Sequence, residues 1–283
     1  TVTAGSIKLG ETGTLASTVS MSGGTLDADE TLTLSGALSQ SGAITIDVAD
    51  GKTLTYSGAA VSLGANTLTM SGGGTLSNTN VLDLNNASSK LLLSSSITVA
   101  KVSTSADNSG LDVDDGSTVT SLTVGHTTPV SIAPTKTLSG AITITAGSIK
   151  LGEAGTLASS VSMSGGTLDA DESFTLSGAL TQAGAITIDV ASGKTLTYSG
   201  AALNLGAYTL TMSGEGRFSN TYVLGLNNAD SKLLLNSITV DSVSTSADNS
   251  GLDVDDDSTV TSLTVGHITP VSIAEGKTLS CRL

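Results

Sequence analysis

Short runs of strictly alternating apolar and polar residues recur along the whole chain, and clusters of Gly, Asn, Asp and Ser separate them. The segment ITIDVADGKTLTYSG, residues 44–58, contains an alternating run, the turn sequence ADG and a second alternating run. Successive side chains of a strand point to opposite faces, so each run predicts a β-strand with one buried face. The separating residues are typical of tight turns, and β-branched residues dominate the runs.

Helices are not expected anywhere in the chain. No window of about a dozen residues has an amphipathic pattern that is free of Gly and of β-branched runs. The segment NNASSKLLL, residues 85–93, is the only weak helical candidate, and we interpret it as a turn followed by a strand.

The chain is a tandem repeat. The stretch TSADNSGLDVDDGSTVTSLTVGH, residues 104–126, returns at 245–267 with a single change. Roughly four in every five aligned positions are identical across the whole repeat, and a fixed long period indicates a repeat architecture. The sequence therefore predicts repeat copy one at 1–142 and repeat copy two at 143–283, both in one continuous solenoid.

Many short strands with small turns could form a sandwich, a membrane barrel or a solenoid. An immunoglobulin-type sandwich usually has a core Trp, and this chain has none. A membrane barrel needs strands of about 9–11 residues and aromatic girdles, whereas these runs are half that length. The sequence therefore predicts an all-β fold, a parallel β-helix (β-solenoid) of about fourteen coils of about 20 residues each.

The composition limits which residue types can form the core and which classes of partner are expected. With only two Phe and four Tyr, the core must consist of Leu, Val, Ile and Ala. The formal net charge of −14 repels phosphate backbones, so we expect no nucleic-acid partner. No apolar run approaches the roughly 18 residues of a membrane helix, so no membrane span is expected in this segment. The single Cys excludes an internal disulfide framework.

The phrases VADGKTLTYSG (48–58) and SGGTLDADETLTLSGAL (22–38) resemble the passenger domains of bacterial autotransporters and other large surface adhesins. The resemblance covers nearly the whole chain. It implies a right-handed parallel β-helix on the bacterial cell surface, serving as a stalk, fibre or adhesin. No cluster of catalytic residue types is visible, so we expect an extracellular structural or adhesive repeat segment rather than an enzyme.

The expected partners follow from the architecture. Each coil buries its aliphatic row only against neighbouring coils, and open ends would expose unpaired strand edges. We therefore expect further copies of the same repeat, or end-to-end self-association, as partners. A cell-surface glycan or protein is the other partner class that we consider. No cofactor is expected beyond loosely bound calcium.

The acids of the repeated stretch are the candidate calcium ligands. Their D-V-D-D-G spacing resembles part of a calcium loop but lacks its distal Glu. Two turns flanking a short strand at 111–113 explain the same residues more simply, because Asp and Asn are common in turns. The weak metal candidates are Asp112, Asp114, Asp115, Asp253, Asp255, Asp256 and Asp257.

Pairs of Thr separated by one aliphatic residue suggest the alternative function, a specialised binding solenoid for ice, calcium or a glycan. Regular T-x-T ladders resemble the surface that several antifreeze proteins present to ice. The phrases TVSMSG, TLTLSG, TLTYSG and TLTMSG end at unequal steps, however, so we favour Thr as an ordinary exposed strand residue. The candidate outer ladder is Thr31, Thr33, Thr53, Thr55, Thr67, Thr69, Thr195, Thr197, Thr209 and Thr211.

Two further sets of residues have weaker claims to chemistry. Asp27 and Asp29 could act as the paired carboxylates of a glycosidase, but aromatic platforms and basic residues are scarce, so a solvated turn is favoured. His126 and His267 occur once in each copy, which is too sparse for a zinc site or a catalytic triad. We interpret both as polar corner residues.

Overall fold

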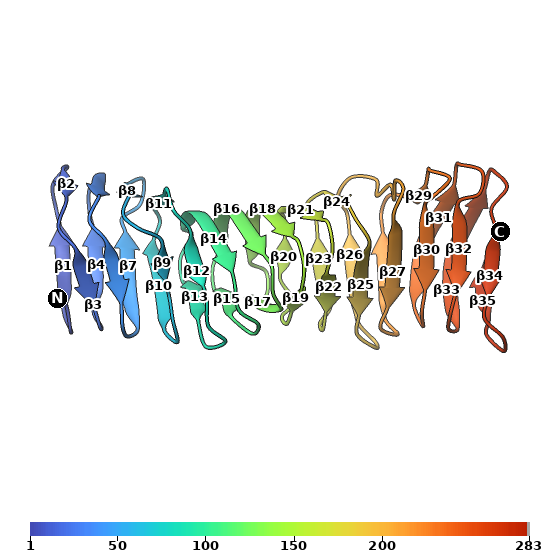
Figure 1. Cartoon of the computed structure of the whole chain (residues 1–283), viewed down its shortest axis with the longest axis horizontal. Helices are drawn as coiled ribbons and strands as arrows, with labels where there is room; N and C mark the ends of the chain where they lie inside the picture. Colours follow the sequence, from blue (N-terminus) through green and yellow to red (C-terminus); the bar gives the residue numbers. More distant parts are fainter. Residues whose placement is uncertain (282–283) are drawn as a thin grey trace. The chain divides into compact units, whose positions relative to one another are not determined.

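The computed structural model describes residues 1–281, which form strands and turns and contain no helix. Among these residues, no helical segment has the length and hydropathy needed to cross a bilayer. The chain divides into two compact units, Thr1–Ile142 (unit 1) and Thr143–Leu283 (unit 2). Within each unit, strands pair in parallel with the equivalent strands of the neighbouring turns (Figure 1). This confirms the predicted all-β, parallel β-solenoid of about fourteen coils.

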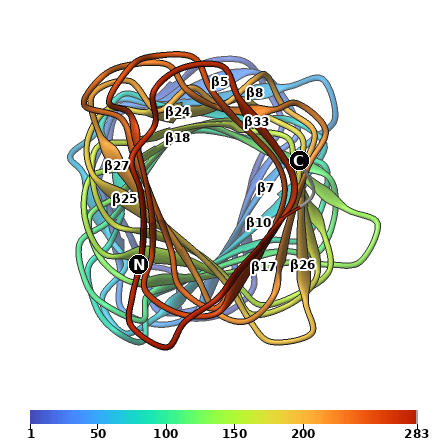
Figure 2. The same ribbon diagram turned by 90° about the vertical axis from the view of Figure 1, so that its right-hand side faces the viewer.

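Each turn of unit 1 passes through three walls. The first wall contains β1 (Ser6–Leu9), β4 (Thr25–Ala28), β7 (Ile44–Val48), β10 (Thr67–Gly72), β13 (Lys90–Leu93), β15 (Gly110–Val113) and β17 (Thr128–Ile132). The second wall contains β2 (Thr14–Leu15), β5 (Leu32–Leu34), β8 (Thr53–Tyr56), β11 (Thr75–Asn78) and the starts of β14 (Thr98–Thr104) and β16 (Ser117–Val124). The third wall contains β3 (Val19–Met21), β6 (Leu38–Gln40), β9 (Val61–Ser62), β12 (Leu82–Leu84) and the ends of β14 and β16. Strand β18 (Thr137–Ile144) includes the last residues of unit 1. The view along the turns shows β5 and β8 on a different side from β7 and β10 (Figure 2).

Unit 2 repeats this arrangement. Its first wall contains β19 (Ser148–Leu151), β22 (Thr167–Ala170), β25 (Ile186–Val190), β27 (Thr209–Ser213), β30 (Lys232–Leu235), β32 (Gly251–Val254) and β34 (Val271–Ile273). Its second wall contains β20 (Thr156–Leu157), β23 (Phe174–Leu176), β26 (Thr195–Tyr198), β28 (Arg217–Asn220), the starts of β31 (Thr239–Thr245) and β33 (Ser258–Val265), and β35 (Leu279–Cys281). Its third wall contains β21 (Ser160–Met163), β24 (Leu180–Gln182), β29 (Leu224–Leu226) and the ends of β31 and β33.

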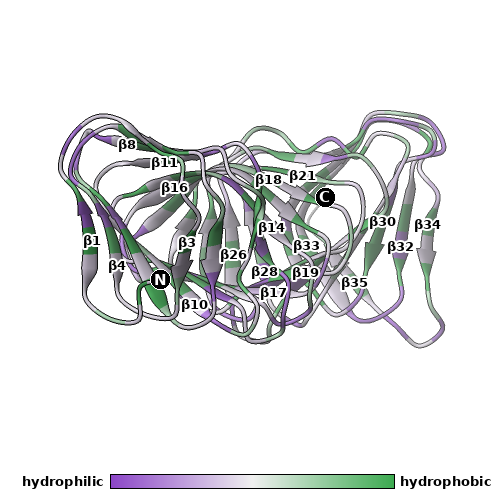
Figure 3. Cartoon of the chain, turned by 60° about the vertical axis from the view of Figure 1, so that its left-hand side comes forward, coloured by the Kyte–Doolittle hydropathy of each residue, from purple (hydrophilic) through white to green (hydrophobic). Residues whose placement is uncertain are grey.

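The alternating sequence pattern becomes alternating burial in the strands. In β7, Ile44, Ile46 and Val48 are at most 3% exposed, whereas Thr45 and Asp47 are only partly covered. Hydrophobic and hydrophilic residues are interspersed along the strands of both units (Figure 3). In-register pairing then stacks buried aliphatic residues of successive turns on one another, and this stacking gives each unit its narrow core.

The number of residues per turn varies from 19 to 24 in unit 1. The positions that pair in sequence along the first wall give these steps: Ser6, Thr25, Thr45, Thr69, Leu92, Asp112 and Ser131. The four similar phrases of the sequence occupy different walls, because β3 lies in the third wall, β5 and β8 in the second, and β10 in the first. Their unequal spacing therefore does not reflect irregular turns.

A buried asparagine fixes the corner between the second and third walls. Asn78 is 2% exposed, and its Nδ2 donates to the carbonyl oxygens of Asn80 and Lys101 at 2.8 and 2.7 Å. Its Oδ1 accepts from the backbone N–H groups of Ala100 and Lys101, each at 3.1 Å. The side chain thus replaces ladder hydrogen bonds where the chain bends, and Asn220 does the same in unit 2.

The cores of the two units differ at one level. In unit 2, Phe218 stacks against Tyr198 with ring centroids 5.9 Å apart. Leu76 occupies the position of Phe218 in unit 1, where it lines a small apolar cavity of about 10 Å³ together with Tyr56. The larger side chain of unit 2 therefore takes up space that is left unfilled in unit 1.

Candidate functional site

The acids of the repeated stretch in unit 1 form ion pairs with lysines of neighbouring turns. Asp112 pairs with Lys90, and Asp115 Oδ1 lies 2.8 Å from Lys136 Nζ. Asp114 is exposed. As predicted, the acids lie in or beside two turns that flank a short strand, β15.

The equivalent acids of unit 2 have the same kind of partners. Asp253 Oδ2 lies 2.5 Å from Lys232 Nζ, and Asp256 Oδ1 lies 2.6 Å from Lys277 Nζ. The hydrogen bond from Lys277, followed by that from the backbone N–H of Asp257, lowers the pKa of Asp256 to about 2. Asp255 is exposed, and Asp257 accepts a hydrogen bond from the backbone N–H of Thr278 at 2.7 Å.

The geometry of these acids does not favour a calcium loop. Residues 1–281 contain no group of three or more His, Cys, Asp or Glu side chains that is placed to hold a metal ion. A calcium ion takes six to eight oxygen ligands. At these turns it would also compete with lysine ammonium groups for the same carboxylates.

A column of charged residues follows the first wall of unit 1. Lys8 Nζ lies 2.6 Å from Asp29 Oδ2 and 3.7 Å from Asp27 Oδ2. Burial, and then the charge of Asp29, raise the pKa of Asp27, whereas the hydrogen bond from Lys8 lowers the pKa of Asp29. The predicted solvated turn is wrong for Asp27, which lies within β4 directly opposite Asp47. These two carboxylates therefore take part in ion pairing between neighbouring turns.

The same column in unit 2 yields a pH-dependent prediction. Asp169 lies opposite Asp189, 3.6 Å from Lys150 Nζ, and is 16% exposed. Burial, and then the charge of Asp171, raise its pKa above the ordinary 3.8. The folded state therefore binds this proton more tightly than the unfolded state, so its ionisation reduces stability as the pH rises from 3.8 through the raised pKa.

Asp169→Asn is therefore expected to become more stable relative to the wild type as the pH rises through this window, with a constant difference above it. Urea unfolding of both proteins between about pH 3 and pH 7 measures the difference. Asp230→Asn, at an exposed position in another turn of unit 2, is the control. A difference for Asp169→Asn that does not change with pH would contradict the explanation.

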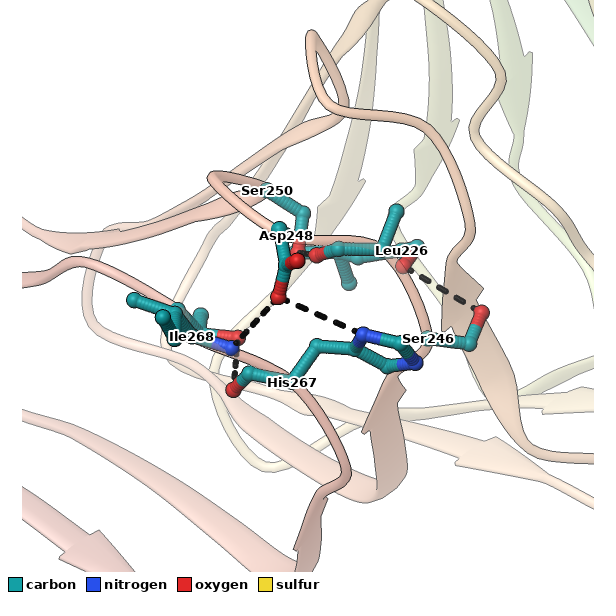
Figure 4. A network of polar contacts seen from close by, with 8 residues as sticks. Leu226, Ser246, Asp248, Ser250, His267 and Ile268 are labelled. Carbon is teal, nitrogen blue, oxygen red and sulfur yellow. Dashed lines mark hydrogen bonds and ion pairs between the residues drawn. The ribbon is translucent and has the colours of Figure 1, made fainter.

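Each histidine joins two neighbouring turns at a corner. His267 Nδ1 lies 3.3 Å from Asp248 Oδ1, which also accepts a hydrogen bond from the backbone N–H of Ile268 at 3.0 Å (Figure 4). That backbone bond, more than His267, lowers the pKa of Asp248. Ser246 Oγ points to the carbonyl of Leu226, 3.5 Å away, so it has no hydrogen bond to the histidine (Figure 4).

His126 has the same arrangement in unit 1. Its Nδ1 lies 3.5 Å from Asp107 Oδ1, and this oxygen accepts a hydrogen bond from the backbone N–H of Thr127 at 2.8 Å. The repetition in both units indicates a structural link between turns. Within residues 1–281, neither His–Asp pair is hydrogen-bonded to a serine that could act as a nucleophile.

The structure divides the predicted Thr ladder between two walls of each unit. The second wall of unit 1 holds Thr31, Thr33, Thr53 and Thr55, and the first wall holds Thr67 and Thr69. In unit 2, Thr195 and Thr197 lie on the second wall, and Thr209 and Thr211 lie on the first. The pairs on different walls cannot form one surface.

The register of the second wall of unit 1 reveals a different and more regular array. One column consists of Thr53, Thr75, Thr98 and Thr118, and Thr31 extends it by accepting a hydrogen bond from the backbone N–H of Thr53 at 3.2 Å. The parallel column consists of Thr14, Thr33, Thr55 and Ser77. We call these nine residues the hydroxyl face.

The T-x-T motif alone does not find Thr14, Thr75 and Thr98. Thr14 is separated from Thr12 by a Gly instead of an aliphatic residue, and the residues two positions after Thr75 and Thr98 are Ser77 and Ala100. Comparing the sequence turn by turn, rather than phrase by phrase, would have found them. All three occupy the same outward positions of successive second-wall strands as the predicted Thr residues.

The larger surface hollows are open grooves. One of about 520 Å³ in unit 1 lies between β1 and β2 and contains Lys8 and Glu11. One of about 340 Å³ in unit 2 is bordered by Glu215 and Asp257, with hydroxyl groups between them. Neither groove contains a histidine or cysteine that could act as a base or nucleophile.

Comparison of the chain with protein-family models, with curated proteins and with solved structures yields no match.

Proposed function

We propose that this chain is a non-catalytic structural or adhesive repeat segment of a large bacterial surface protein or fibre, located outside the cell. The observation that carries the proposal is the repetition of in-register parallel pairing through seven first-wall strands in each of two near-identical units. Such pairing makes each turn a rigid spacer, and added repeats add length without a new core design.

The surface chemistry supports an extracellular role. Lysines pair with acids of adjacent turns along both units, as Lys52 does with Glu30 and Lys194 with Glu172, each at 2.5 Å. The remaining surface is acidic and rich in hydroxyl groups, and net charge far from zero keeps a protein soluble. The resemblance of the GKTLT and LTLSG phrases to surface adhesins points to the same location.

Further copies of the same repeat are the partners that the architecture favours. The turn that begins with AGSIKLG occurs identically at 4–10 and 146–152, so repeats can follow one another without a change of register. Strand edges accept another strand through their free backbone groups. End-to-end self-association uses the same chemistry, and a cell-surface glycan or protein is the second partner class that we propose.

Labelling of the source bacterium tests the location. Antibodies raised against the purified chain are expected to label intact cells, and external protease is expected to remove the label. A cytoplasmic protein of the same cells serves as the control and must stay unlabelled until the membrane is opened. Labelling that appears only after permeabilisation would refute the proposal.

A further inference from the structure

The hydroxyl face of unit 1 is a two-dimensional lattice. Neighbouring turns of a β-sheet are separated by about 4.8 Å, and residues i and i+2 of one strand, such as Thr53 and Thr55, by about 6.6 Å. The aliphatic residue between them, Leu54, is 1% exposed and anchors the strand in the core. The backbone ladder therefore fixes the outward groups in both directions.

The hydroxyl groups of this face are available to water. Apart from Thr31, no hydroxyl of the face has a hydrogen-bond partner within the part of the chain that the structure describes. The nine side chains are exposed or half-buried, and none of them is charged. Charged groups border the face instead, with the Glu30–Lys52 pair before its first column and Lys101 beyond its second.

Unit 2 provides a natural contrast on the same backbone. Its second wall pairs Thr195, Arg217, Thr239 and Thr259 in one column, so Arg217 stands where unit 1 has Thr75. Arg217 Nη2 lies 2.7 Å from Asp241 Oδ1, and Asp241 stands where unit 1 has Ala100. Ser219, the counterpart of Ser77, donates to Asp241 Oδ2 at 2.7 Å.

This difference changes how the surface organises water. Uncharged hydroxyl groups at fixed spacing can each hold a water molecule at a defined site, and methyl groups separate these sites. An ion pair instead gathers water around its charges, and here it also removes one hydroxyl group from the array. A surface that is already rigid loses little entropy when it joins an ordered lattice.

We propose that the hydroxyl face of unit 1 binds ice, and that the second wall of unit 2 does not. The ligand is the ordered water of the crystal surface, held by two columns of threonine and serine. This activity goes beyond the proposed structural role, because a spacer does not require two neighbouring hydroxyl columns that no charged residue interrupts, and in unit 2 Arg217 and Asp241 interrupt them.

The experiment follows single ice crystals in a dilute buffered solution of the full chain and measures the gap between melting and growth temperatures. The incorporation of the chain into slowly growing ice is measured in parallel. The test variant is Thr75→Arg with Ala100→Asp, which installs the pair that unit 2 already accommodates. The matched control is Thr69→Arg on the first wall of unit 1. Circular dichroism and melting temperature show that each variant is folded.

The wild-type chain is expected to change the shape of the ice crystals and to hold their growth temperature below their melting temperature. It is also expected to be incorporated into the growing ice. The double variant should lose most of the gap and of the incorporation, whereas Thr69→Arg should keep both. Crystals that grow in the wild-type solution as they do in buffer would overturn the proposal. A double variant as active as the wild type, or an equal loss in Thr69→Arg, would also overturn it.

Discussion

Asn78→Ala is expected to destabilise the middle turns of unit 1 by about 3–5 kcal/mol. The substitution removes two donated and two accepted hydrogen bonds at a side chain that is 2% exposed. Alanine would leave the backbone groups of Ala100 and Lys101 at this part-buried corner without these partners. The loss is measured by urea unfolding and by hydrogen exchange of the amides in β11 and β14.

Asn80→Ala is the matched control for this substitution. Asn80 is exposed, donates one side-chain hydrogen bond to the carbonyl of Gly58 at 2.7 Å, and is replaced by Tyr222 in unit 2. Its replacement should cost about 1 kcal/mol or less. Equal losses for the two variants would show that Asn78 is not the structural centre of this corner.

Gly72→Ala is expected to cost about 3 kcal/mol or more, because two separate penalties act at one position. Gly72 has a φ of 84°, which side chains rarely adopt. A Cβ at this position would also meet the backbone oxygen of Val48 at 1.9 Å. The pairing of β10 with β7 must shift to relieve that overlap. The backbone amides of both strands should therefore be less protected from hydrogen exchange.

Two other glycines separate the penalties. Gly51 has a φ of 67°, and a Cβ added to it would meet no atom within 4 Å, so Gly51→Ala should cost only about 1–2 kcal/mol for its backbone conformation. Gly10 has neither a positive φ nor a close neighbour, and Gly10→Ala should leave the free energy of unfolding almost unchanged. If Gly72→Ala costs no more than Gly51→Ala, the close approach of the two strands has no energetic consequence.

Local features of the sequence were enough to predict the strands and the solenoid. Alternation at residues 44–48 predicts β7, and the turn chemistry around residues 111–113 predicts β15 between two turns. These signals need only neighbouring residues, and the repeat multiplies them. The prediction of a turn and strand at 85–93 is also confirmed, because β13 begins at Lys90.

The wall to which each strand belongs could not be read from such local signals. TLTLSG at 31–36 and TLTMSG at 67–72 are nearly the same phrase, yet one supplies the second wall and the other the first. The assignment depends on the register between turns, which joins residues about 20 positions apart. For the same reason the sequence did not reveal the lysine partner of Asp112 or the buried role of Asn78.

The separation of paired residues by 19 to 24 positions also affects how the protein can form. A new turn needs only the turn before it as a template, so closing each loop carries a similar and modest entropic cost. Folding can therefore advance in the direction in which the chain is released from a ribosome or a secretion pore. Each completed turn then hinders backward sliding of the chain through such a pore.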